Sequence, residues 1–155
     1  MSEAFQIRGG KKLHGEITPQ GAKNEALQIL CAVLLTDEEV RIKNIPDIHD
    51  VNRLIEILGD FGVKITKNAH GDYTFKADQV NFDYIKSKEF KKDGAKLRGS
   101  IMILGPMLAR FGEAYMPTPG GDKIGRRRLD THFQGFVELG AEFHYDETEY
   151  FYTLK

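Results

Sequence analysis

The sequence predicts an α/β protein (α+β in some classifications) that contains two copies of one supersecondary unit. Hydrophobic residues change repeatedly between the spacing typical of buried helices and the spacing typical of strands. This pattern recurs at a nearly constant shift of about 75 residues, which indicates an internal duplication. The length of 155 residues corresponds to about one domain of ordinary size. We therefore expect the chain to consist mainly of two similar units.

The first unit is expected at about residues 20–78. Its second helix carries apolar residues at three-residue spacing and ends at Gly62, which matches a C-terminal helix cap. The strand-like stretch 13–18 precedes the unit and would complete the order β-α-β-α-β-β. From the start, the predicted elements of the unit are a buried helix from residue 23, a strand at 39–42, a helix ending at Gly62, and strands at 63–65 and 73–75.

The second unit is expected at about residues 95–155 and repeats that order. Its elements are a buried helix from Arg98, a strand at 113–116, a helix at 133–139 followed by Gly140, and strands at 141–143 and 150–154. Between the units, residues 79–94 alternate lysines with acidic residues, a pattern typical of a solvated linker. Residues 1–19, with a short strand near Ile7, stand outside the repeat.

Composition excludes several classes of function. The 22 Lys and Arg against 23 Asp and Glu give a net charge of −1, which disfavours nucleic-acid binding through bulk basicity. The apolar runs at 27–35 and 101–109 are shorter than the roughly 18 residues of a membrane span. Cys31 is the single cysteine, and the first residues do not resemble a signal peptide, so we expect a soluble, cytoplasmic protein. Cys31 itself is expected to be a buried small hydrophobic residue.

The densest polar stretch is 119–132, between a predicted strand and a predicted helix. Its glycines allow the backbone to approach a ligand, and Arg126 to Arg128 supply planar donors for phosphate or carboxylate around Asp122. The spacing of Gly120 and Gly125 matches a P-loop, but arginines stand where Lys-Ser/Thr is required, so we reject a nucleoside-triphosphate site. The stretch therefore predicts a local anion-binding loop.

Two further cations occupy equivalent places in the two units. Lys23 and Arg98 each stand at the start of a predicted helix, where a positive charge opposes the helix dipole. One such residue could be incidental, but two at equivalent positions indicate that an anion binds there. Asp130 and His132 lack further clustered ligands, so we expect no metal site and assign Asp130 as a helix N-cap.

Three motifs occur in a fixed order along the chain: Gly21-Ala22-Lys23-Asn24, Leu97-Arg98-Gly99-Ser100, and the stretch 119–132. On these motifs, the sequence resembles the UDP-N-acetylglucosamine 1-carboxyvinyltransferase family over essentially the whole chain. The resemblance implies an inside-out α/β barrel of repeated β-α-β-α-β-β units, of which two are present. It also implies transfer of the enolpyruvyl group of phosphoenolpyruvate to the 3-hydroxyl of UDP-N-acetylglucosamine, with release of phosphate and without a metal or organic cofactor.

The resemblance also assigns roles to single residues. Lys23 matches a catalytic lysine that contacts phosphoenolpyruvate, and Asn24 lies beside it where the two substrates meet. Arg98 matches an arginine that clamps anionic groups. Asp122 stands where most members have the cysteine that acts as general acid or in product release, which resembles natural variants resistant to fosfomycin. Arg127 matches a second clamp, and it begins the segment that holds the uridine end, which continues with Arg128, Leu129, Asp130 and Thr131.

The family pattern also includes a second domain that is missing here, and that domain contributes an aspartate base and a further arginine. The resemblance therefore implies that residues 1–19 belong to the sheet of that domain and that the 155-residue chain alone lacks turnover. Two alternatives stay open. One is an enzyme like enolpyruvylshikimate-phosphate synthase, and the other is a non-catalytic fragment that binds a UDP-sugar; binding to RNA ends is a more distant third.

Overall fold

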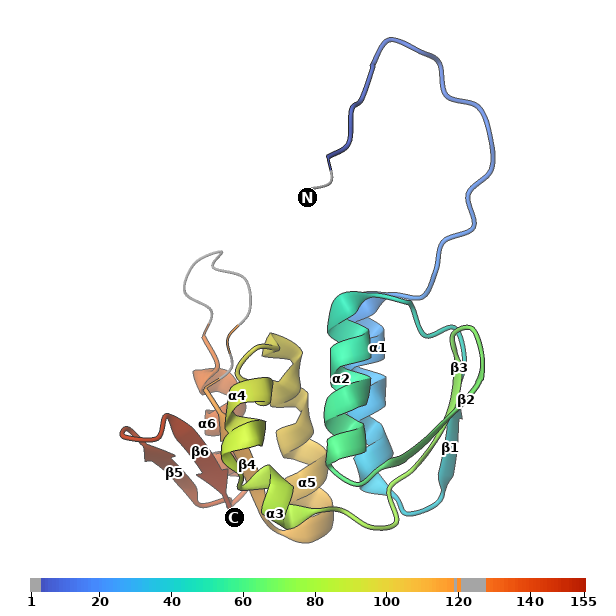
Figure 1. Cartoon of the computed structure of the whole chain (residues 1–155). Helices are drawn as coiled ribbons and strands as arrows, with labels where there is room; N and C mark the ends of the chain where they lie inside the picture. The colour runs from blue at the N-terminus through green and yellow to red at the C-terminus, as the bar shows by residue number, and fades with distance from the viewer. Residues whose placement is uncertain (1–3, 119, 121–127) are drawn as a thin grey trace.

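The computed structural model describes residues 4–118, 120 and 128–155. Two antiparallel three-stranded sheets lie on opposite sides of a group of helices that includes α1, α2, α4 and α5 (Figure 1). In chain order the elements are α1 (Lys23–Ala32), η1 (Val33–Leu35), β1 (Glu39–Ile42), α2 (His49–Asp60), β2 (Lys64–Ala69), β3 (Asp72–Lys76), α3 (Phe82–Ile85), α4 (Lys88–Gly94), η2 (Arg98–Ile103), α5 (Leu104–Phe111), β4 (Ala114–Pro117), α6 (Asp130–Glu138), β5 (Phe143–Asp146) and β6 (Phe151–Leu154).

The same order of elements occurs twice, as the repeat predicted. Each unit runs helix, strand, helix, strand, strand, and in each sheet the last strand lies in the centre, with orders β1-β3-β2 and β4-β6-β5. The registers agree too, because Phe75 pairs with Val40 on one side and Ile65 on the other, while Tyr152 pairs with Met116 and Tyr145. The mixed α/β class and the order of elements within each unit are therefore confirmed.

The second helix of each unit ends in the same way. Gly62 and Gly140 both adopt positive φ, at 92° and 98°. In each case the next residue closes the helix end, since Val63 N–H donates to Leu58 O and Ala141 N–H donates to Phe136 O, both at 3.0 Å. This is the bond expected of a Schellman cap, in which glycine avoids the steric cost of the left-handed conformation. The predicted glycine caps are confirmed.

The segment between the units differs from the solvated linker expected at residues 79–94. It forms the short helices α3 and α4, whose N-caps are Asn81 and Ser87, and both side chains accept a bond from a backbone N–H three residues later. Ile85 and Phe90 are completely buried, and the Phe90 ring lies edge-on to Phe61 at 4.9 Å between centroids. The alternating charges occupy the outer face of these helices and conceal their apolar contribution to the core.

The N-terminal segment also differs from expectation. Residues 4–20 form neither helix nor strand, so the strands expected near Ile7 and at 13–18 are absent. The reason is physical: a strand needs a neighbour to satisfy its backbone groups, and in the described residues this segment extends away from both sheets (Figure 1). Its large apolar side chains Phe5, Leu13 and Ile17 are more than 90% exposed.

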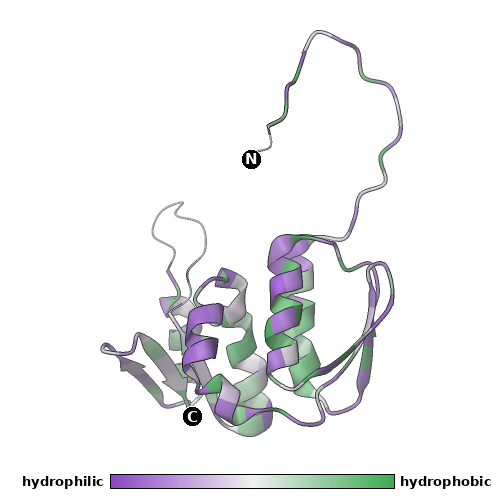
Figure 2. Cartoon of the chain, in the orientation of Figure 1, coloured by the Kyte–Doolittle hydropathy of each residue, from purple (hydrophilic) through white to green (hydrophobic). Residues whose placement is uncertain are grey.

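One hydrophobic core joins the two units. The apolar faces of the helices turn toward one another and toward the sheets, whereas the outward faces are polar (Figure 2). In α2 the buried residues Val51, Leu54, Ile57 and Leu58 recur at the three- and four-residue spacing of one helix face. The largest fully buried side chains come from both units: Leu30, Leu34, Leu54, Ile57, Leu58, Phe61, Phe75, Ile85, Phe90, Ile103, Leu104 and Met107.

Arg110, near the end of α5, bonds the second unit to the first. One terminal nitrogen of its guanidinium lies 3.1 Å from Leu34 O, 2.9 Å from Thr36 O and 2.9 Å from Ala77 O. These carbonyls follow α1 and β3, so a single charged group satisfies backbone acceptors from two segments of the first unit. Hydrogen bonds from a charged donor are among the stronger ones in proteins.

We expect Arg110→Ala to lower the free energy of unfolding by about 2–3 kcal/mol, because three part-buried carbonyls lose a charged donor. Urea unfolding followed by circular dichroism measures this change. Arg8→Ala, in the exposed N-terminal segment, is the control and should change it by less than about 0.5 kcal/mol. Equal stability of the two variants would contradict this role of Arg110.

Candidate functional site

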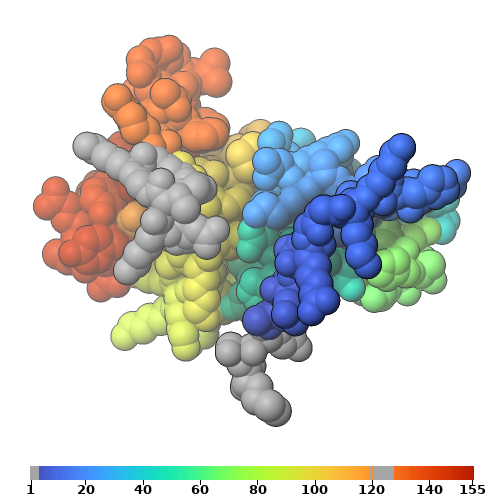
Figure 3. Space-filling model, turned by 90° about the horizontal axis from the view of Figure 1, so that it is seen from above, coloured from blue at the N-terminus to red at the C-terminus, as the bar shows by residue number. Residues whose placement is uncertain are grey.

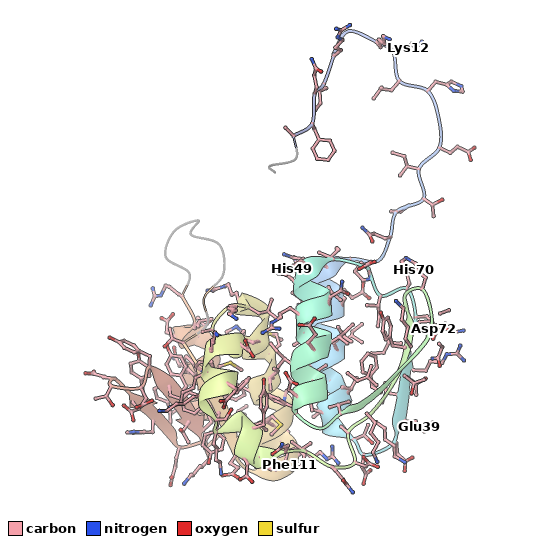
Figure 4. The ribbon with its side chains drawn as sticks, in the orientation of Figure 1. Lys12, Glu39, His49, His70, Asp72 and Phe111 are labelled. Carbon is pink, nitrogen blue, oxygen red and sulfur yellow. The ribbon has the colours of Figure 1, made fainter. Side chains whose placement is uncertain are left out.

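Three helices of the two units begin at the same end of the molecule. Lys23 is the first residue of α1, His49 of α2 and Arg98 of η2. His49 and Phe111 mark opposite ends of the helical group in Figure 4. Seen from the end where the helices begin, the light-blue atoms of α1 lie beside the yellow atoms near η2 (Figure 3). Unsatisfied backbone N–H groups therefore collect at this end and favour a negative ligand.

A cleft of about 740 Å³ opens at this end. It lies between the first unit and the start of the second. Its lining is Lys23, Asn24, Leu27, Gln28, His49, Asp50, Lys96, Leu97, Arg98, Gly99, Ile101 and Met102. The sequence-predicted residues Lys23, Asn24 and Arg98 are thus brought together, although Arg98 is 75 positions from Lys23 (98 − 23).

Gly21 determines how α1 approaches the rest of the first unit. A Cβ atom at this position would lie 2.1 Å from the carbonyl oxygen of Asn44, so the turn before α2 can pack this closely only against glycine. Two residues later Lys23 begins the helix, and Ala22 O accepts the bond from Ala26 N–H at 3.0 Å. The Gly-Ala-Lys-Asn motif therefore fixes the position of the helix start as well as supplying the lysine.

The cations of the cleft differ in their partners. Lys23 Nζ lies 2.7 Å from Asp50 Oδ2. Lys96 Nζ lies 3.2 Å from Asp93 Oδ1, and Asp93 also forms an ion pair with Arg53. Arg98 donates to a backbone carbonyl, Arg128 O, at 3.4 Å. The described residues of the lining include three cations and one carboxylate, so they give the cleft local positive charge within a chain of net charge −1. Such a cleft is suited to a phosphate or carboxylate.

The predicted anion-binding loop falls largely outside the described residues. Asp122, Arg126 and Arg127 all lie outside them. Two described residues of this stretch have contacts: Gly120 N–H donates to Ala95 O at 2.6 Å, and Arg98 donates to Arg128 O. The segment 95–98 therefore contacts the chain on both sides of the loop and also presents Lys96 and Arg98 to the cleft.

Residues 128–131, predicted to hold the uridine end, are not among the described residues that line the cleft. Asp130 is the first residue of α6, whose N-cap is Leu129, so the N-cap assignment of Asp130 was wrong. Its carboxylate pairs instead with Arg128, whose Nε lies 2.9 Å from Oδ2. Arg128 thus supplies hydrogen-bond donors to the carboxylate of Asp130, two residues later in the chain. The negative charge of this carboxylate still complements the N-terminus of α6. Thr131 is exposed on the first turn.

Four polar residues among the described lining of the cleft were not predicted: Gln28, His49, Asp50 and Lys96. Asp50 is in the first turn of α2, a common place for an acidic residue, and Lys96 ends the charge run between the units. Both patterns have ordinary structural explanations, so the sequence offered no signal that set these residues apart. These residues line the cleft only because the two units pack against each other.

Cys31 is buried in α1 at 1% exposure, as expected. Burial raises the pKa of its thiol to about 12, so at neutral pH the group is protonated and unsuited to act as a nucleophile. Among residues 4–118, 120 and 128–155, no three His, Cys, Asp or Glu side chains are clustered as a metal site. The same residues contain no helix with the length and apolarity needed to cross a membrane.

Comparison with known proteins gives consistent matches. The family model described as EPSP synthase (3-phosphoshikimate 1-carboxyvinyltransferase) matches residues 7–155. The UDP-N-acetylglucosamine 1-carboxyvinyltransferase of Bacteroides thetaiotaomicron is 56% identical over 151 residues, which cover 97% of this chain and 35% of that protein. The protein of the same name from Porphyromonas gingivalis is 54% identical over 149 residues, with coverage of 95% and 34%. The chain thus spans about a third of the length of the curated relatives it matches.

A solved structure shows the same fold. The enolpyruvyl transferase NikO from Streptomyces tendae aligns with a TM-score of 0.73 at 20% identity, covering 95% of this chain and 31% of that one. The agreement extends over nearly all of this chain and supports the mixed α/β arrangement described above.

If the cleft binds anions, Arg98→Ala should weaken the binding of inorganic phosphate at least about tenfold, because a charge-assisted hydrogen bond contributes roughly 1.5–3 kcal/mol. Phosphate titration followed by the backbone amides of Gly99 and Met102 in NMR spectra measures this affinity. Arg41→Ala is the matched control, since Arg41 pairs with Asp72 on the first sheet and is not part of the cleft lining. Equal weakening in both variants would show that overall charge, and not the cleft, governs binding.

Proposed function

Because the chain belongs to the EPSP synthase (3-phosphoshikimate 1-carboxyvinyltransferase) family, we propose that it is part of an enolpyruvyl transferase that acts on UDP-N-acetylglucosamine. One observation carries the proposal most directly. Lys23, Asn24 and Arg98 meet in one positively charged cleft at the common end of three helices, in a chain 56% identical to proteins with that activity in their name. The reaction would be the first committed step of peptidoglycan synthesis, in the cytoplasm.

The proposed reaction is an addition followed by an elimination. The 3-hydroxyl of the sugar loses its proton to a base, proposed to be the aspartate of the second domain. Its oxygen bonds to C2 of phosphoenolpyruvate while C3 gains a proton from the general acid, which gives a tetrahedral intermediate. The C2–O bond to phosphate then breaks, C3 loses a proton, and the enolpyruvyl ether and inorganic phosphate remain. Negative charge stays on the phosphate and carboxylate throughout, so the main requirement of the site is fixed cations.

Residues of the cleft fit this requirement. The ammonium of Lys23 and the guanidinium of Arg98 would hold the phosphate and carboxylate of phosphoenolpyruvate, and the helix N-termini would add to their field. The carboxamide of Asn24 offers both a donor and an acceptor beside Lys23, suited to a sugar hydroxyl. Arg127 is proposed as a second clamp, and Arg128, Leu129, Asp130 and Thr131 as contacts to the uridine end.

Asp122 is proposed as the general acid. A carboxyl group can deliver a proton to C3 if it is protonated when the substrate is bound. The neighbouring arginines of the sequence favour the ionised form, whereas exclusion of water on substrate binding favours the protonated form. The role of Asp122 thus depends on the bound substrates.

The proposal also covers the parts of the enzyme beyond this chain. The two units are proposed as part of an inside-out α/β barrel, completed by a second domain that supplies an aspartate base and another arginine. The exposed apolar side chains of residues 4–20 support a role for this segment as a strand of that domain's sheet. Sheet pairing would satisfy its backbone groups and cover Phe5, Leu13 and Ile17.

Two other functions have specific support. The description of the matching family model favours a shikimate-phosphate substrate, and the positively charged cleft also fits a fragment that binds a UDP-sugar without catalysis. Titration with UDP-N-acetylglucosamine, shikimate 3-phosphate and phosphoenolpyruvate distinguishes these possibilities. Binding of shikimate 3-phosphate in preference to the nucleotide sugar would contradict the proposed substrate.

We expect the 155-residue chain to release no phosphate from phosphoenolpyruvate and UDP-N-acetylglucosamine above a control without enzyme, because the base for the sugar hydroxyl is proposed to lie in the second domain. A colorimetric phosphate assay measures the rate, and the Bacteroides thetaiotaomicron relative serves as the positive control. Phosphate release by the chain alone would show that its own residues suffice for the reaction.

Fosfomycin should leave the protein unmodified, because a carboxylate at position 122 is a much weaker nucleophile toward the epoxide than a thiolate. Intact-protein mass spectrometry with UDP-N-acetylglucosamine present measures the adduct. Asp122→Cys is the matched variant and should gain one fosfomycin, whereas buried Cys31 should not react in either protein. A covalent adduct on Asp122 itself would contradict the expected resistance.

A further inference from the structure

Asp50 is the one carboxylate among the described residues that line the cleft. It is the second residue of α2, while its partner Lys23 is the first residue of the neighbouring α1. The 2.7 Å contact between Lys23 Nζ and Asp50 Oδ2 therefore joins two helix starts that are 27 residues apart in the sequence. Both side chains are about 40% exposed, at 44% for Lys23 and 39% for Asp50, so solvent and ligands reach the pair.

The two helix starts place opposite demands on these charges. The N-terminus of α2 stabilises the carboxylate of Asp50, whereas the N-terminus of α1 repels the ammonium of Lys23. Lys96 and Arg98 in the same cleft add further repulsion. A lysine side chain is long and has about 2 kcal/mol of rotamer entropy, so without an acceptor in the cleft it would turn toward solvent. Asp50 supplies that acceptor.

We propose that Asp50 is a positioning residue that holds the Lys23 ammonium inside the cleft for the anionic substrate, an inference that rests on the proposed function. An ammonium group has three N–H donors. Asp50 accepts one of them, and two remain for the phosphate or carboxylate of phosphoenolpyruvate. Asp50 acts through Lys23 and need not touch the substrate.

A positioning role of Asp50 and a simple charge effect predict opposite changes in substrate affinity when the Asp50 carboxylate is neutralised. As a charge, Asp50 repels an anionic substrate, so its neutralisation would tighten binding. As a positioning residue it orders Lys23, so its neutralisation should weaken binding even though the cleft becomes more positive. The sign of the change in affinity therefore identifies the role.

The experiment titrates the chain with phosphoenolpyruvate and follows the backbone amides of Gly99 and Met102, which line the cleft. We expect Asp50→Asn to bind about fivefold more weakly than the unmodified chain, because a neutral acceptor forms a hydrogen bond of about half the strength. Asp50→Glu keeps the charge and should recover most of the affinity. Spectra of each variant without ligand verify its fold.

Asp47→Asn is the matched control. It removes the same charge just before α2, and the carboxamide oxygen can still accept the bond that Asn52 donates to Asp47 Oδ1 at 2.7 Å. Asp47 is not part of the described cleft lining, so this variant should bind as well as the unmodified chain or slightly better. A loss equal to that of Asp50→Asn would overturn the inference.

A double-mutant cycle with Lys23→Ala isolates the pair. With Lys23 absent, Asp50→Asn should no longer weaken binding and should tighten it slightly, since the carboxylate then only repels the ligand. The inference is overturned if Asp50→Asn weakens binding equally in both backgrounds, or if it fails to weaken binding in the unmodified one. Failure of the unmodified chain to bind, or an unchanged affinity in Lys23→Ala, would instead overturn the proposed function at this cleft.

Discussion

The common direction of the helices is the constraint on which the candidate site depends. In each unit the first helix runs away from the cleft, a strand returns, and the second helix again begins near the starting end (Figure 1). Duplication repeats this path, so α1, α2 and η2 present their N-termini to one region. Each start contributes partial positive charge, which makes this end of the molecule, and not the sheets, the more favourable place for an anion.

The cleft lies at the boundary of the two units, so its geometry requires that they pack in one fixed arrangement. The shared apolar core supplies most of this packing, but apolar contacts have little directional preference. Arg110 adds direction, because its guanidinium must meet carbonyls of Leu34, Thr36 and Ala77 at once. This contact lies next to Phe111, at the end of the helices opposite His49, where it can limit rotation of one unit against the other (Figure 4).

The sequence predicted those features that periodicity or duplication determines locally. The order of elements within each unit and the glycine caps follow from patterns within one unit, and the equivalent places of Lys23 and Arg98 follow from the repeat. Features that depend on contacts between distant segments were not predicted. The Lys23–Asp50 pair joins residues from two helices, and the strand expected at 13–18 did not form because no neighbouring strand lies beside it. Asp122 and Arg127 remain predictions from the sequence, outside the described residues.

The balance of charge in the chain has a local counterpart in the cleft. A site that holds a highly charged anion needs several cations close together, and these cations repel one another whenever the anion is absent. A single carboxylate at the start of α2 reduces this cost without neutralising the cleft, since Lys96 and Arg98 still outnumber it. The helix dipole stabilises that carboxylate where it lies, so the arrangement lowers the repulsion between the cations and still leaves the cleft with an excess of positive charge. The near-zero net charge of the sequence therefore conceals a site whose charges are separated by helix position.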